Sequence, residues 1–162
     1  MKKEILIDEN NVEFFYDEDL NMWRLIETPH ILEDTLIDFE IDLIHFENDV
    51  IWKDVENFIK IIKRDMNKNF KNIDDAKSIL LILFQKIYAN TFSSEILQNI
   101  DFTVSGIDYK GFCKNINLQD KYEYDYFFFP YCINDESRDV GTFVWRASFR
   151  DKLLFGVFCD QL

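Results

Sequence analysis

The segment 37–43 alternates apolar and acidic residues, and this alternation constrains the fold more than any other feature of the sequence. The apolar positions are Ile37, Phe39, Ile41 and Leu43, and the acidic positions are Asp38, Glu40 and Asp42. Because successive side chains of a strand point to opposite faces of a sheet, one face is expected to be buried and the other to carry a row of carboxylates. The apolar period then changes to helical spacing, at Ile51, Val55, Phe58, Ile59, Ile62 and Met66. A half-buried strand therefore precedes an amphipathic helix.

The other periodicities place short strands at both ends of the chain and helices in the middle. Alternating or apolar runs predict strands at 4–8, 12–16, 22–27, 35–46, 102–105, 107–113, 122–131, 143–149 and 153–157. Apolar residues at helical spacing predict helices at 50–67, 73–89 and 94–99. Thr28-Pro29 is expected to end a strand, because proline lacks a backbone N–H group, and 30–34 is expected to form a loop.

These elements predict a single α+β domain over residues 1–162. The strands from the two ends of the chain are expected to form a mostly antiparallel sheet, with the two main amphipathic helices, 50–67 and 73–89, packed on one face. Hydrophobic residues make up 48% of the chain, which is too apolar for a disordered protein and enough for a single core.

The net charge of −13 is concentrated in the first third of the chain. Residues 1–57 contain 17 acidic and 4 basic residues, whereas residues 58–162 contain 14 of each. A field of this sign repels nucleic acid and anionic membranes and attracts cationic proteins. The sequence therefore predicts a partner protein with a basic surface, although an acidic region that only improves solubility stays open as the alternative.

The candidate partner-binding residues are the carboxylates of this acidic region. They are Asp17, Glu18, Asp19, Asp38, Glu40, Asp42, Glu47 and Asp49. Carboxylates at every second position of a strand are about 6–7 Å apart, which resembles a phosphate backbone more than a catalytic pair. The spacing Asp17-x-Asp19-x-Asn21 is also that of the start of a calcium loop, but Met22 stands where the turn needs glycine. A hairpin turn is expected there, and no metal site.

Cysteines, glycines and apolar runs point to no cofactor, disulfide or targeting segment. Cys113, Cys132 and Cys159 are widely spaced and include no Cys-x-x-Cys, and the four glycines are isolated rather than gathered in a phosphate-binding loop. The N-terminus lacks the apolar stretch of a signal peptide, and the most apolar run, 79–84, is too short to cross a membrane. A cytoplasmic protein without a cofactor is expected.

Two other interpretations of the sequence use different residues. The aromatic strand 122–131 predicts the surface of a non-enzymatic adaptor or scaffold protein, because tyrosine suits half-buried interfaces. His45 stands two residues before Glu47, a spacing that an enzyme could use for acid–base chemistry. No nucleophile or second ligand is spaced to join His45, so a structural or surface histidine is expected and no enzyme is predicted.

The whole chain resembles the small acidic immunity proteins of bacterial toxin–immunity pairs. The resemblance rests on the acidic stretch from Asp17 to Glu56, the helix that carries Trp52 and Phe58, and the aromatic C-terminal hairpin from Thr142 to Cys159. It implies a non-catalytic inhibitor that binds a cognate toxin domain and blocks its active site. With the charge pattern, it leads to the hypothesis of an antitoxin that meets a cationic toxin, such as a nuclease, through its acidic surface.

Overall fold

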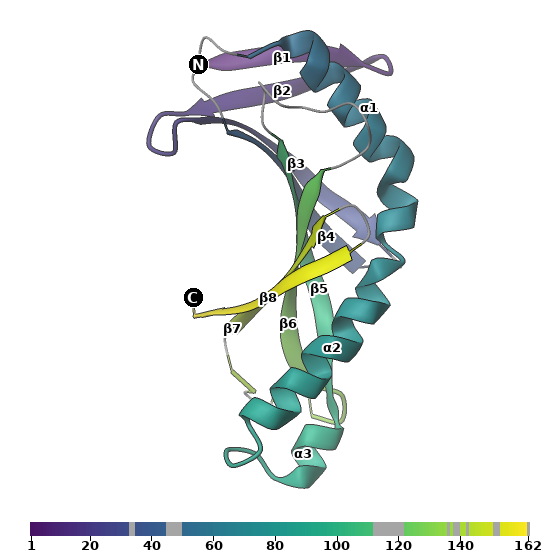
Figure 1. Ribbon diagram of the computed structural model, residues 1–162, viewed down its shortest axis with the longest axis vertical. Helices are drawn as coiled ribbons and strands as arrows, with labels where there is room; N and C mark the ends of the chain where they lie inside the picture. The colour runs from purple at the N-terminus through teal and green to yellow at the C-terminus, as the bar shows by residue number, and fades with distance from the viewer. Residues whose placement is uncertain are drawn as a thin grey trace.

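The eight strands in the described part of the chain form one sheet, in which the spatial order of the strands follows the order of the sequence (Figure 1). The computed structural model describes residues 1–32, 35–44, 50–111, 122–135, 137, 140–141, 143–150 and 153–161. The strands are β1 (Lys2–Ile7), β2 (Asn10–Asp17), β3 (Met22–Leu32), β4 (Thr35–Ile44), β5 (Ile100–Gly111), β6 (Glu123–Cys132), β7 (Phe143–Arg150) and β8 (Leu153–Gln161). Every neighbouring pair is antiparallel except β4 and β5, which are parallel.

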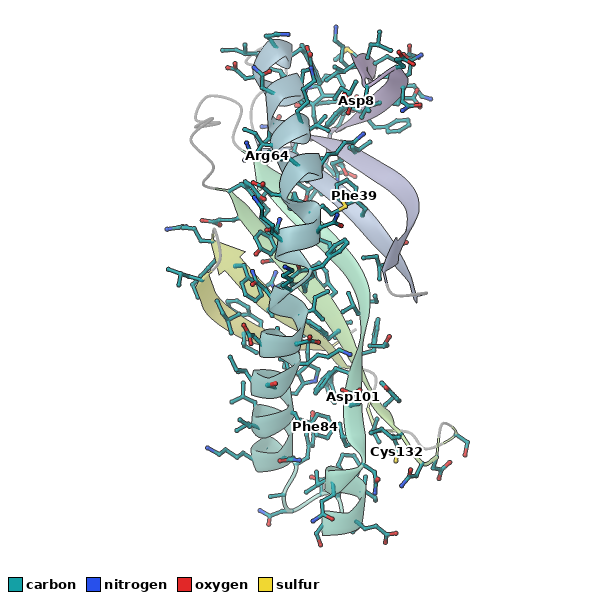
Figure 2. The ribbon with its side chains drawn as sticks, turned by 90° about the vertical axis from the view of Figure 1, so that its right-hand side faces the viewer. Asp8, Phe39, Arg64, Phe84, Asp101 and Cys132 are labelled. Atoms are coloured by element: carbon teal, nitrogen blue, oxygen red, sulfur yellow. The ribbon has the colours of Figure 1, made fainter. Side chains whose placement is uncertain are left out.

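The helices lie between β4 and β5 in the sequence, because a parallel pair needs a long crossover connection. They are α1 (Trp52–Asn69), α2 (Asn72–Ile87) and the short α3 (Ser94–Gln98). Phe70 and Lys71 separate the first two helices and themselves have right-handed helical backbones. As a result α1 and α2 follow one another along one side of the sheet, as seen from that side in Figure 2. The predicted α+β domain with two main helices on one face of a mostly antiparallel sheet is confirmed.

The core lies between these helices and the sheet. From β4 it receives Ile37, Phe39, Ile41 and Leu43, which are at most 3% exposed, as the alternation in the sequence predicted. Val55, Phe58, Ile59 and Ile62 fill it from α1, and Ile73, Ala76, Leu80 and Phe84 from α2. The Phe84 ring contacts Phe102 of β5 and Trp145 of β7, at centroid distances of 5.9 and 6.0 Å. None of the helices in the described ranges is both long and apolar enough to cross a membrane.

The predicted break at Thr28-Pro29 is wrong, because β3 continues through both residues to Leu32. The register shifts there: Glu27 pairs with Phe39 and His30 with Ile37, so two residues of β3 oppose a single residue of β4. This is a β-bulge, where proline is tolerated in a sheet because the extra residue need not donate to the ladder. The predicted strands 102–105 and 107–113 are likewise a single strand, β5, with a register shift between Val104 and Gly106.

Candidate functional site

The side of the sheet opposite the helices, called the open face below, carries charged side chains at its centre. No helix of the described residues covers it (Figure 1). Because the apolar residues of β4 point toward the helices, Asp38, Glu40 and Asp42 point to the open face. The registers of the neighbouring strands place further charged residues on the same face: Arg24, Asp108, Lys110, Glu123, Asp125, Arg146 and Arg150.

One transverse row of the open face alternates in charge across five strands. Consecutive pairs in the register are Arg24 with Asp42, Asp42 with Lys110, Lys110 with Glu123, and Glu123 with Arg150. The Arg24 Nε donates to Asp42 Oδ1 at 3.1 Å, and the Arg150 Nε donates to Glu123 Oε1 at 2.9 Å. Cross-strand pairs of opposite charge stabilise a sheet, so this row is compensated within the protein.

The next row is acidic and only partly compensated. It consists of Glu40, Asp108 and Asp125, which face one another across β4, β5 and β6. Among the described residues, Asp108 forms no hydrogen bond or ion pair. Its carboxyl group has a pKa raised to about 6, chiefly by burial and then by the charges of Asp42 and Asp125, against which the cations of Lys110 and Arg24 act in part. At neutral pH this central carboxylate therefore carries its charge against an unfavourable environment.

Asp125 is the most deeply buried carboxylate of the open face, at 2% exposed, and it is paired. The Lys110 ammonium contacts its Oδ2 atom, and an Nη1 atom of Arg146 lies 3.9 Å from the same oxygen. Arg146 also lies 3.9 Å from Asp160. A buried carboxylate is stable only when paired in this way, so Lys110 and Arg146 have a structural role at this position.

Part of the predicted partner-binding set is neutralised by the protein itself. The Arg24 guanidinium contacts Glu40 and Asp42 and lies 3.6 Å from Asp17. These three carboxylates, which come from β2 and β4, are therefore brought together around one cation. Their charges are compensated locally, so a partner would gain less from them than the sequence suggested.

Three other predicted partner-binding carboxylates are exposed and have no neighbouring cation of this kind in the described part of the chain. Asp38 is exposed on β4, and Glu18 and Asp19 are exposed in the turn between β2 and β3. None of the three forms an ion pair with a described residue. Glu47 and Asp49, and also His45, lie outside the described residues. The uncompensated acids among these residues therefore lie in two places: Asp38 is a diagonal neighbour of Asp108 across β4 and β5, and Glu18 and Asp19 lie in the turn that precedes Met22, at the other end of β4.

The hairpin turn predicted at 17–21 is confirmed. The backbone N–H of Leu20 donates to Asp17 Oδ1 at 3.0 Å, and Asn21 has a positive φ of 52°. Within the described ranges, no three or more histidine, cysteine, aspartate or glutamate residues are grouped so that they could hold a metal ion.

Asp108, Lys110 and Asp125 were not predicted from the sequence to be open-face residues. The alternation of Ile107 and Tyr109 with these polar positions was a usable signal, because it resembles the alternation of β4. The missing information was the register, since the parallel pairing of β4 with β5 joins residues 68 positions apart in the sequence, such as Asp38 and Gly106.

Three of the four tyrosines in the aromatic strand 122–131 are buried, and the fourth, Tyr131, is 38% exposed and donates to Asp101 Oδ2. Tyr122, Tyr124 and Tyr126 are at most 8% exposed and face the helices. Asn69 donates to the hydroxyl groups of Tyr109 and Tyr122, at 3.2 and 2.8 Å, which connects the end of α1 to the sheet. The three buried tyrosines of this strand are core residues, so a partner cannot reach them in the folded protein.

The structure is that of an α+β protein whose sheet is covered by helices on one face and carries charged side chains on the other, the open face. Comparison of the chain with protein-family models, curated proteins and solved structures gives no significant match. Its function is therefore inferred from its own residues.

Proposed function

We propose that this protein is a non-enzymatic binding protein of the immunity or antitoxin type. It holds a cationic toxin domain, such as a nuclease, against the acidic part of the open face and occludes the toxin's active site. The proposed contact residues are the acids without an ion pair to a described residue: Asp38 and Asp108 on the sheet, and Glu18 and Asp19 in the turn between β2 and β3.

The observation that carries this proposal is the position of Asp108. A half-buried carboxylate between Asp42 and Asp125 opposes folding at neutral pH, and the described residues give it no partner. An asparagine there would remove the repulsion. Unfavourable charge of this kind is typical of functional sites, where a bound cation supplies the missing compensation.

The distribution of charge along the chain also supports a basic partner. Because the acidic excess lies in residues 1–57, the half of the sheet formed by β1–β4 is negative, while the rest of the chain is neutral. A field from one side orients an approaching basic partner and raises its association rate, and salt screens that effect. The same field disfavours nucleic acid as a ligand.

The proposal is tested with the protein encoded beside this one in its native genome, which is the expected partner of an immunity protein. Binding and its dependence on salt are measured with the purified pair. We expect Asp38→Lys to weaken binding at least about tenfold, because a charge reversal in a desolvated contact costs more than about 1.4 kcal/mol.

Asp74→Lys is the matched control, since Asp74 is an exposed acid in the first turn of α2, on the helical side of the sheet. It makes the same change in net charge and is expected to leave the affinity nearly unchanged. Equal loss in both variants would reduce the effect to general charge attraction. Binding that neither variant nor salt affects would contradict the proposed surface.

A further inference from the structure

The two edge strands of the sheet differ in how well they are protected against pairing with another strand. Within the described ranges, β1 pairs only with β2, and β8 only with β7. An edge strand presents unpaired backbone groups, and charged side chains, lysine above all, discourage other strands from pairing with them. β1 carries Lys2, Lys3 and Glu4, whereas the only charged residue in the sequence of β8 is Asp160.

β8 also exposes large apolar side chains. Leu153 is 74% exposed, Phe155 54% and Phe158 43%. The Arg146 guanidinium lies over the Phe158 ring at 4.6 Å, and that of Arg150 lies over the Phe155 ring at 5.6 Å. These cation–π contacts cover the rings only in part, so an apolar strip remains along the unpaired edge.

The charges at the two ends of β8 are self-complementary. Arg150 pairs in register with Leu153, at the start of β8, and Asp160 lies near the end of β8. Arg150 contacts Glu123 and Asp160 lies 3.9 Å from Arg146, but the two side chains are still 65% and 58% exposed, so each can also approach a charge of a second copy. Both side chains belong to the open face. When two copies of β8 lie antiparallel about a two-fold axis, the start of each strand meets the end of the other, so that each Arg150 approaches the Asp160 of the other copy.

We propose that a second copy of this chain pairs with β8 and that the two sheets join into one continuous sheet. The net charge of −13 does not prevent this association, because the excess lies in residues 1–57, whose strands are the ones farthest from β8 in the sheet order. The two acidic halves then lie at opposite ends of the assembly and stay free for their own contacts.

The dimer is concentration-dependent. One strand pair with its flanking side chains buries less than the roughly 1,200–2,000 Å² of a stable standard-size interface. Dissociation constants in the micromolar range are therefore expected rather than a permanent dimer.

Sedimentation equilibrium of the full chain between about 5 and 500 µM tests the proposal directly, over a range chosen to span micromolar dissociation. We expect the mass to rise from 19.6 kDa toward twice that value. The double variant Leu153→Lys/Phe155→Lys should keep the monomer mass throughout, because edge lysines block strand pairing. Both side chains are more than half exposed, so the variant is expected to fold, and circular dichroism checks this.

Leu6→Lys on β1 is the matched control, because Leu6 is 65% exposed on the opposite edge of the sheet. It should dimerise like the unchanged protein. Hydrogen exchange gives a second readout: the amides of β8 should become protected as concentration rises, and those of β1 should not. A constant monomer mass of the unchanged protein, or a dimer that Leu6→Lys abolishes and the β8 variant retains, would overturn the proposal.

Discussion

Lys110 and Asp125 are diagonal neighbours on adjacent strands, and the Lys110 ammonium contacts a carboxylate that is only 2% exposed. The nearest other described cation, Arg146, lies 3.9 Å away. The pair therefore supplies most of the compensation for the deepest charge of the open face. Removing one member of a buried ion pair destabilises a protein more than replacing both members by apolar residues, because the remaining charge stays buried without compensation.

We expect Lys110→Met to lower the free energy of unfolding by about 2–4 kcal/mol, since the apolar part of the side chain is kept while the cation is lost. Urea denaturation at neutral pH measures the change. Lys53→Met is the control, because Lys53 pairs with Glu56 on the exposed surface of α1 and should change stability little. Similar losses in the two variants would show that Asp125 is compensated from elsewhere.

Asp108→Asn should alter how stability depends on pH. Since the folded-state pKa of Asp108 is raised to about 6, above its ordinary value of 3.8, the folded protein favours the protonated form. The free energy of unfolding of the unchanged protein should fall by about 2 kcal/mol as the pH rises from about 4 to about 7. The asparagine variant should lack this component.

The pH series uses urea unfolding of the two proteins side by side, so that the titration of all other groups cancels in the difference. The difference between the two curves should change mainly between about pH 4 and about pH 6, the unfolded and folded pKa values of Asp108, and should level off above that range. Parallel curves across this range would show that Asp108 titrates normally. The same variant should bind the proposed cationic partner more weakly, which would make its gain in stability a loss in function.

The turn between β1 and β2 stores backbone strain that a glycine should relieve. Asp8 and Glu9 join the two strands with positive φ values of 49° and 68°, and neither is glycine. We expect Glu9→Gly to raise the free energy of unfolding by about 0.5–1 kcal/mol, because two-residue hairpin turns of this type favour glycine.

Asn11→Gly is the control for the turn variant, as Asn11 is exposed on β2 and has no positive φ. It should lower the free energy of unfolding by about 0.5–1 kcal/mol through the added freedom of the unfolded chain. Thermal and urea unfolding should agree in sign for both variants. Destabilisation by Glu9→Gly would show that the Glu9 side chain contributes more than its backbone strain costs.

The hydrogen bonds from Asn69 to two buried tyrosines should be important for the junction of α1 and the sheet. Asn69 is 3% exposed, and burial raises the pKa of the Tyr109 hydroxyl group well above its ordinary value. We expect Asn69→Ala to lower the free energy of unfolding by about 2–3 kcal/mol, from the lost bonds and the space left behind.

A double-mutant cycle with Tyr109→Phe isolates the bond between Asn69 and Tyr109. If this bond contributes, the double variant should lose less stability than the sum of the single variants, because both partners of the bond are then gone. Additive losses would assign the effect of Asn69→Ala to packing and to the bond with Tyr122.

Local patterns predicted most of the elements and the orientation of β4. The alternation at 37–43 identified both the buried residues and the acidic face, because the two-residue period of a strand needs no information from elsewhere in the chain. The spacing of apolar residues also predicted the buried faces of α1 and α2. The continuation of β3 through Pro29 could not be predicted, since a bulge depends on the neighbouring strand that accommodates it.

The candidate site was only partly predictable for the same reason. Glu40 and Asp42 were expected to be available to a partner, but Arg24, sixteen residues before Glu40, neutralises them once β3 and β4 pair. Asp108 was not predicted as a site residue, although in the structure burial and the charges of Asp42 and Asp125 raise the pKa of its carboxyl group to about 6.

Local periodicity was enough to predict the inward-facing residues of β4, α1 and α2, and a count of charges placed the negative excess in residues 1–57. Which charges meet depends on the folded chain, because the register between strands distant in the sequence sets the contacts on the open face. The parallel pairing of β4 with β5 places Asp108 beside Glu40, and the pairing of β5 with β6 places it beside Asp125. Electrostatic energies depend on such separations and on burial, and neither is encoded in any local stretch of sequence.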